Sequence, residues 1–186
     1  TGTIKITTRQ TVQLHGILKS EIKPTIQSFN TLHLDSIAAC GDVNRNVTCS
    51  AHPKESAFNE EVFQYADKIS VMALPKTRAY YQIWLDEEQI ADKNEEDPLY
   101  QDRYLPRKFK IGIAIPPNND VGLIAIIENN ELKGFNIAAG GGLSSTHGNP
   151  NTYARLATVL GFVNTENVLK AVYEVMTIQR DHGNRS

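Results

Sequence analysis

The chain has 186 residues, which is enough for one domain of ordinary size or for two small ones. Hydrophobic residues make up 40% and charged residues 22%, the balance of a soluble globular protein. The net charge of −2 gives no general attraction to nucleic acid, and no run of about 18 apolar residues predicts a spanning helix. We therefore expect neither a nucleic-acid partner nor a membrane partner.

The first residues and the cysteines bear on the cellular setting. The chain begins with Thr1 rather than Met and shows no charged-then-apolar leader, so we expect a fragment without a secretory signal. Cys40 and Cys49 are too few for a disulfide framework, which favours a cytoplasmic location. Neither their spacing nor that of the five histidines matches a metal-ligand pattern. No metal ligand is therefore predicted in this chain.

The first half of the chain predicts one strand and two helices. Residues 3–8 alternate apolar and polar side chains, as in a strand. Residues 20–32 and 56–72 carry the three- and four-residue apolar spacing of helices, and Pro75 ends the second of them. Residues 38–48, with several Gly, Asp and Asn, predict a loop that leads into a strand.

The second half predicts a hairpin among further strands and helices. Asn129-Asn130 is a two-residue turn of the kind that favours positive φ between paired strands. The predicted elements are a strand at 79–85, an acidic loop at 86–97, strands at 109–115, 122–128 and 131–138, and helices at 152–160 and 165–179. Together these elements predict an α+β fold with a central sheet.

Two lysines flank Phe109 in the predicted strand that begins there. Because alternate side chains of a strand share a face, Lys108 and Lys110 point to the same side. Two neighbouring ammonium groups repel each other unless an anion lies between them. This pattern fits an anion site, or an edge strand that lysines protect from pairing.

Two polar segments carry further candidate residues. Arg45 projects from a loop rich in Asp and Asn, and arginine suits bidentate binding of an oxyanion, although exposed loop arginines are common. Residues 7–16 read as a polar strand-to-helix connection, in which Arg9 and Gln13 could share a helix face. The alternative for this segment is a polar turn with a capping threonine.

A glycine triplet, Gly140-Gly141-Gly142, follows an apolar strand. Glycine lets backbone approach a ligand closely, and its N–H groups can hold an anion. The triplet matches neither the phosphate loop nor the dinucleotide fingerprint. From these motifs alone we predict an anion-binding α+β domain.

In this order the motifs resemble the sulfite and nitrite reductase haemoprotein family. The resemblance covers nearly the whole chain. It is carried by Thr8-Arg9-Gln10-Thr11-Val12-Gln13-Leu14-His15-Gly16, Asp42-Val43-Asn44-Arg45-Asn46-Val47, Tyr104-Leu105-Pro106-Arg107-Lys108-Phe109-Lys110, Gly134-Phe135-Asn136 through Gly142-Leu143, and Gln179-Arg180-Asp181-His182-Gly183-Asn184-Arg185.

The resemblance implies a fragment of an assimilatory sulfite reductase. Residues 1–36 are then the end of a ferredoxin-like half-domain, and residues 37–186 are the first sirohaem and [4Fe–4S] reductase domain. The intact enzyme would reduce sulfite to sulfide with six electrons, at sirohaem coupled to a [4Fe–4S] cluster. The electrons would come from an NADPH-dependent flavoprotein subunit or from ferredoxin, and this fragment alone should be inactive.

The resemblance also implies roles for individual residues. Three residues match catalytic, substrate-facing groups: Arg45, Lys108 and Lys110. Seven match groups around sirohaem, with its eight carboxylates: Thr7, Arg9, Gln13, Arg45, Arg107, Gly141 and Gly142. The cluster cysteines and a further substrate-site arginine of the family lie outside this chain, and the connection at residues 116–121 is shorter than the family pattern.

Two other functions remain open at this stage. An assimilatory nitrite reductase could use the same scaffold, and relative turnover of the two anions would separate it from a sulfite reductase. A non-catalytic domain could bind a phosphorylated or carboxylated ligand at the same basic residues. A colourless, iron-free full-length protein would favour that second reading.

Overall fold

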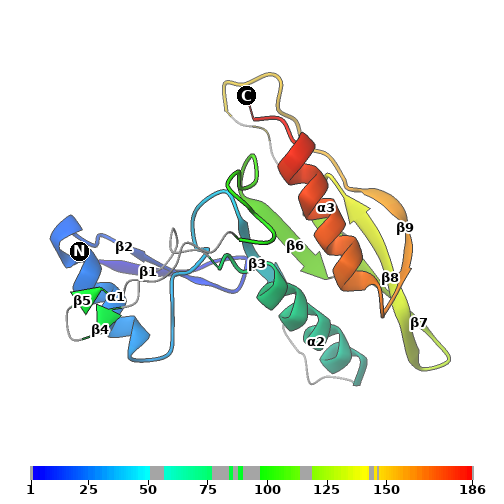
Figure 1. Cartoon of the computed structure of the whole chain (residues 1–186), viewed down its shortest axis with the longest axis horizontal. Coiled ribbons are helices and arrows are strands. Elements are labelled where there is room, and N and C mark those ends of the chain that lie inside the picture. Colours follow the sequence, from blue (N-terminus) through cyan, green and yellow to red (C-terminus); the bar gives the residue numbers. More distant parts are fainter. Residues whose placement is uncertain are drawn as a thin grey trace.

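The computed structural model describes residues 2–50, 57–76, 84–85, 88–89, 97–113, 119–142, 145 and 147–185. These residues form a mixed five-stranded sheet, two small hairpins and three α-helices (Figure 1). The helical elements are the 3-10 turn η1 (Lys19–Glu21), α1 (Ile22–Asn30), α2 (Ala57–Met72) and α3 (Val168–His182). The strands are β1 (Thr3–Ile6), β2 (Val12–His15), β3 (Asn44–Thr48), β4 (Trp84–Leu85), β5 (Glu88–Gln89), β6 (Phe109–Ile113), β7 (Val121–Glu128), β8 (Glu131–Ala139) and β9 (Thr158–Asn164).

The large sheet has the strand order β3-β6-β7-β8-β9. β3, β6 and β7 run parallel, whereas β7, β8 and β9 are antiparallel neighbours. Asn129 and Asn130 join β7 to β8 with φ angles of 52° and 61°, as the two-residue turn predicted. Because β6 lies between β3 and β7, Lys108 and Lys110 do not protect an edge strand, and that alternative is wrong.

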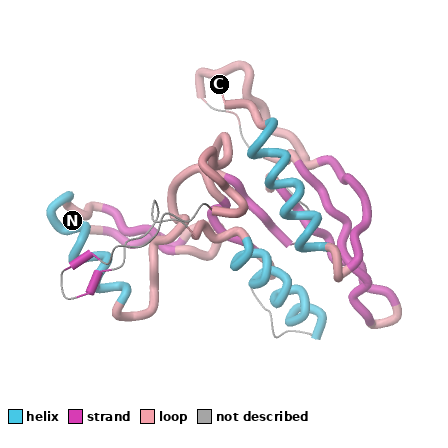
Figure 2. The backbone as a smooth tube through the Cα atoms, viewed as in Figure 1, coloured by secondary structure: helices cyan, strands magenta, loops and turns pink. Residues whose placement is uncertain are grey.

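One face of this sheet carries the hydrophobic core. α2 and α3 contact each other and pack against the sheet (Figure 2). In β6 the side chains of Phe109, Ile111 and Ile113 are buried among these elements. Since side chains alternate along a strand, Lys110 and Gly112 point to the opposite face. The position of β6 in the sheet therefore presents Lys110 away from the apolar core.

The N-terminal part of the chain forms a separate arm with little core of its own. The elements β1, β2, η1 and α1 contain no buried residue, and Ile4, Ile6 and Val12 are exposed. The first buried side chain is that of Ala38. In Figure 1 the β1–β2 hairpin reaches from this arm to β3. The domain boundary expected after residue 36 stays a prediction.

Two predicted elements are wrong. The helix predicted at 152–160 does not form: residues 152–157 lie outside any helix or named strand, and residues 158–164 form strand β9, which pairs along β8. The segment after Arg9 does not turn helical either, since it forms β2, which pairs with β1. Arg9 and Gln13 therefore do not share a helix face. In both places hydrogen bonding to a neighbouring strand outweighs the local pattern.

The remaining predicted elements agree with the structure where it describes them. The predicted strand at 3–8, the helices at 20–32 and 165–179 and the strand entry at 38–48 correspond to β1, α1, α3 and β3, with shifted ends. Several predicted features lie outside the described residues: Ser56, residues 79–83, most of the acidic segment, Pro116-Pro117 and Leu143. No helix in the described part of the chain is long and apolar enough to cross a membrane.

Candidate anion-binding site

Four cationic side chains gather at the start of β6 and form the cationic cluster, Arg9, Arg107, Lys108 and Lys110. Arg9, Arg107 and Lys110 interact with the carboxylate of Asp120, which directly precedes β7, and Lys108 interacts with Lys110. The Nη2 of Arg107 donates to Asp120 Oδ1 at 2.8 Å, and the backbone N–H of Lys110 donates to Asp120 Oδ2 at 3.0 Å. A single carboxylate balances one of four cations, so the cluster keeps an excess of positive charge that suits an anion.

The electrostatics of Lys110 reflect this crowding. Burial lowers the pKa of Lys110, and Lys108, Arg9 and Arg107 lower it further, whereas Asp120 raises it. A lysine with a lowered pKa gives up a proton more readily than an exposed one. A bound anion would favour the charged form again. Lys110 therefore has the properties of an anion ligand that can also deliver a proton.

Asp120 is a residue that the sequence analysis did not select. Burial raises the pKa of its carboxyl group, and the hydrogen bonds and charges of Arg107 and Lys110 offset only part of that effect. Its own backbone carbonyl accepts the N–H of Gly140 at 3.0 Å. The signal that could have indicated Asp120 is its place in the sequence, because it directly precedes a strand that neighbours the basic strand β6.

Arg9 links the N-terminal arm to the sheet. Its guanidinium donates to Asn46 Oδ1 at 2.8 Å, Asn119 Oδ1 at 2.9 Å, and the backbone carbonyls of Asn46 and Ile111 at 2.9 and 3.1 Å. Burial lowers the pKa of Arg9, although Asp120 raises it. Arginine has five N–H groups, so one remains without an acceptor within the described residues.

Three other predicted site residues lie elsewhere in the structure. Arg45 turns back onto its own loop, where it donates to the carbonyls of Ala39 and Gly41, so the described contacts do not bring it to the cationic cluster. Thr7 accepts the backbone N–H of Thr11 and bonds its hydroxyl, as a capping residue of the β1–β2 turn. Gln13 is exposed on β2.

The glycine triplet is held by backbone hydrogen bonds instead of presenting free N–H groups. Gly140, Gly141 and Gly142 donate to the carbonyls of Asp120, Asn119 and Arg155. The prediction that these N–H groups hold an anion is therefore not supported.

A Cβ at Gly141 would lie 2.8 Å from the Asn119 carbonyl oxygen, so the close approach here is between two backbone segments. A Cβ at Gly142 would meet nothing within 4 Å. Gly142 thus leaves open space directly after the two glycines whose N–H groups bond Asp120 and Asn119.

The described residues contain no cluster of three or more His, Cys, Asp or Glu side chains suited to a metal. The whole sequence has two cysteines, Cys40 and Cys49, and burial raises the pKa of the Cys49 thiol. A four-iron cluster needs four thiolates. This chain therefore cannot supply the ligands of such a cluster by itself.

A family model described as "Nitrite and sulphite reductase 4Fe-4S domain" matches residues 64–186. The chain belongs to this family. The match includes Arg107, Lys108, Lys110 and Asp120 and leaves Arg9 and Arg45 upstream. Membership agrees with the resemblance seen in the sequence, and it fixes the family without fixing the role of any single residue.

Members of the family with similar sequences are sulfite reductases by name. The chain is 66% identical over its whole length to the sulfite reductase [NADPH] hemoprotein beta-component of Leptospira biflexa, of which it covers 35%. It is 53% identical to the protein of the same name from Bacillus subtilis and covers 34% of it. The chain thus spans about a third of the length of these relatives.

A solved structure supports the fold. The chain matches the structure of the Mycobacterium tuberculosis NirA protein with a TM-score of 0.66 and 25% sequence identity. The match covers 99% of this chain and 30% of the other. The mixed sheet with its three helices is therefore an architecture that occurs within a larger known protein.

Proposed function

We propose that this chain is the part of an assimilatory sulfite reductase haemoprotein that supplies cationic groups to sulfite and to the sirohaem carboxylates. The observation that carries the proposal is the cationic cluster, in which Arg9, Arg107 and Lys110 interact with one carboxylate, Asp120, and Lys108 interacts with Lys110. The names of the similar relatives support sulfite as the substrate. The complete polypeptide then reduces sulfite to sulfide with six electrons.

The chemistry of sulfite explains why lysines suit this site. Each of its three oxygens leaves as water and takes up two protons, and sulfide takes up the rest. Conversion of SO₃²⁻ to H₂S and three waters thus consumes six electrons and eight protons. Lys110, whose pKa is lowered by burial and by its cationic neighbours, can bind the anion and pass a proton to a departing oxygen.

The chain's residues fit sirohaem in part. When bound, sirohaem and the [4Fe–4S] cluster supply the electron transfer. Arg107 is exposed beyond its contact with Asp120, and Arg9 retains one N–H, so both can bind carboxylates. The open space at Gly142 leaves room for a ligand close to the backbone. The cluster thiolates would come from the rest of the polypeptide.

The electron donor we propose is an NADPH-dependent flavoprotein subunit. The relatives' names specify NADPH and a beta-component, which implies at least one further component in those enzymes. Ferredoxin is the alternative donor. Activity of the purified protein with each donor would distinguish the two, and we propose a cytoplasmic location for the assembly.

The test is an absorption spectrum with iron and sulfide analysis of the full-length protein, produced in a host that makes sirohaem. We expect sirohaem bands and about five irons per chain, from one haem iron and one four-iron cluster. Sulfite and nitrite turnover are then compared on the same sample. A higher kcat/KM for nitrite would reassign the substrate. A colourless, iron-free protein that binds phosphate would instead favour the non-catalytic anion-binding domain.

A further inference from the structure

Residues 98–106, which directly precede Arg107 in the chain, form the approach segment. This segment is held by α3 and by the tail after α3, residues 183–185. Side chains donate to four backbone carbonyls of this segment. Tyr173 donates to the Pro98 carbonyl at 3.0 Å, and Arg180 donates to that of Leu99 at 2.7 Å. Arg185 donates to the carbonyls of Arg103 and Tyr104 at 3.2 and 2.9 Å. Each acceptor is a main-chain oxygen, so the bonds fix the path of the backbone whatever its side chains.

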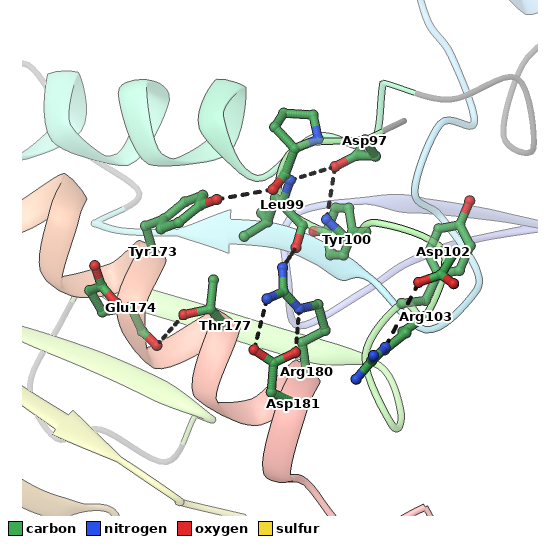
Figure 3. A network of polar contacts seen from close by, with 12 residues as sticks. Asp97, Leu99, Tyr100, Asp102, Arg103, Tyr173, Glu174, Thr177, Arg180 and Asp181 are labelled. Atoms are coloured by element: carbon green, nitrogen blue, oxygen red, sulfur yellow. Dashed lines mark hydrogen bonds and ion pairs between the residues drawn. The ribbon is translucent and has the colours of Figure 1, made fainter. Parts of the chain in front are cut away.

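Arg180 forms the buried end of this attachment. It follows Val168, Val172 and Met176 on the buried stripe of α3 and is 7% exposed. Figure 3 shows its guanidinium between Leu99 and Asp181, which accepts two of its hydrogen bonds at 2.8 Å. A buried charge is tolerated only when such partners satisfy it. Arg180 therefore anchors the first part of the approach segment to the core.

The tail after α3 reaches the other end of the segment, next to the cationic cluster. Besides its bonds to Arg103 and Tyr104, Arg185 donates to the Arg180 carbonyl at 2.8 Å, which ties the tail to its own helix. A Cβ at Gly183 would lie 2.5 Å from Pro106 Cγ. Pro106 thus packs against the tail, and Arg107 and Lys108 follow immediately in the chain.

The opposite side of the segment is attached to the residues that directly precede β3. The N–H of Leu105 donates to the Asp42 carbonyl, and that of Phe109 to the Val43 carbonyl, both at 2.9 Å. The chain that leads to Arg107 and Lys108 is therefore held between residues 42–43, just before β3, and the tail. Without the tail, mutual repulsion among the cations would favour movement of the chain around Arg107 and Lys108, which lie outside the regular sheet pairing.

We infer that Arg185 is a positioning residue that sets the placement of Arg107 and Lys108 toward the anion, by fixing the end of the approach segment. Its guanidinium acts on the cations through the backbone, since its described hydrogen bonds go to the carbonyls of Arg103, Tyr104 and Arg180. This inference rests on the proposed function. It differs from a general role in stability because attachment at the far end, by Tyr173, should stabilise the segment without governing the placement of the cations.

The experiment compares Arg185→Ala and Arg185→Lys with the matched control Tyr173→Phe in the full-length holoenzyme. Tyr173→Phe also removes a donor to a carbonyl of the approach segment, but its acceptor Pro98 lies five and six residues farther from the cations than Arg103 and Tyr104, the acceptors of Arg185. For Arg185→Ala we expect kcat/KM for sulfite to fall about tenfold or more, mainly through KM, at unchanged sirohaem content. Tyr173→Phe should leave kcat/KM near the wild-type value despite a similar loss of thermal stability.

The pH profile supplies a second readout, which the control Tyr173→Phe should leave unchanged. Burial lowers the pKa of Lys110 most, and Lys108 and Arg107 lower it further, so this pKa rises toward its ordinary value if Arg107 and Lys108 shift away. The alkaline limb of kcat/KM for Arg185→Ala should therefore move to higher pH. Arg185→Lys keeps the charge but cannot reproduce the planar fork, so it should show a smaller change in the same direction.

The outcomes separate this inference from the proposed function. If wild-type protein reduces sulfite but the Arg185 variants match Tyr173→Phe in KM and pH profile, the positioning role is wrong and the function stands. If wild-type protein does not reduce sulfite, the function is wrong, and calorimetry with inorganic phosphate decides the positioning role. Weaker phosphate binding in Arg185→Lys than in Tyr173→Phe would support it, and equal binding would overturn it.

Discussion

Arg9 and Asn46 hold each other through three hydrogen bonds, although 37 positions separate them in the chain. Arg9 donates to the Asn46 side-chain oxygen at 2.8 Å and to its carbonyl at 2.9 Å, and the Asn46 amide donates to the Arg9 carbonyl at 2.8 Å. This reciprocal pair attaches the β1–β2 turn to strand β3. It is the contact that brings a cation of the N-terminal arm to those of β6.

Replacing Asn46 with Ala should therefore detach the arm from the sheet. The change removes one acceptor and one donor for Arg9 and leaves part of its half-buried guanidinium unpaired. We expect a loss of about 1–3 kcal/mol in the free energy of unfolding, measured with denaturant on the full-length protein. Hydrogen exchange should also accelerate in β1 and β2. The exposed residue Arg103 offers a control, since Arg103→Lys should change neither quantity.

Lys108→Ala and Lys110→Ala should slow sulfite reduction far more than they reduce sirohaem content. Each change removes a cation from the cluster, and Lys110→Ala also removes the proposed proton donor. We expect kcat/KM per bound sirohaem to fall about 10²- to 10³-fold. Lys133→Ala, at the exposed end of β8, is the control, because Lys133 pairs only with Glu131 among the described contacts. Equal losses of turnover and of sirohaem would contradict the assigned role.

The two glycines Gly141 and Gly142 should respond differently to Ala. At Gly141 a Cβ would lie 2.8 Å from the Asn119 carbonyl, so Gly141→Ala should lower the melting temperature. At Gly142 the space is open, so Gly142→Ala should fold with nearly unchanged stability. If a ligand occupies that space, Gly142→Ala should nevertheless lose sirohaem, measured by its absorption per protein. Full retention of sirohaem in a stable Gly142→Ala protein would remove Gly142 from the site.

The buried carboxyl group of Asp120 should give stability a specific pH dependence. Because the folded-state pKa is raised, this group favours folding below its unfolded pKa, and that contribution disappears as pH rises through the folded value. Asp120→Asn removes the titration. The melting temperature of wild type relative to this variant should therefore increase as pH falls from 7 toward about 4. A constant difference over that range would show that Asp120 keeps an ordinary pKa in the folded protein.

Local chemistry determined several elements without help from the rest of the fold. Asn129-Asn130 adopts positive φ and joins two paired strands, because the required turn conformation suits Asn at both positions. The helix from Ala57 follows from its apolar spacing. The lysines at the start of β6 were also selected from the sequence, since alternation along a strand places Lys108, just before β6, and Lys110, within it, on one side.

Only the tertiary structure decided the partners of these residues. β9 is a strand because β8 lies beside it. The local residue pattern of a segment contains no information about a neighbour that is distant in sequence. The same holds for Arg9, which bonds Asn119 across 110 positions, and for Arg45, which turns back onto its own loop. The sequence by itself determined which charges this protein carries and its family resemblance. Packing of distant segments decided which of those charges meet at Asp120, because hydrogen-bond geometry exists only after the chain has folded.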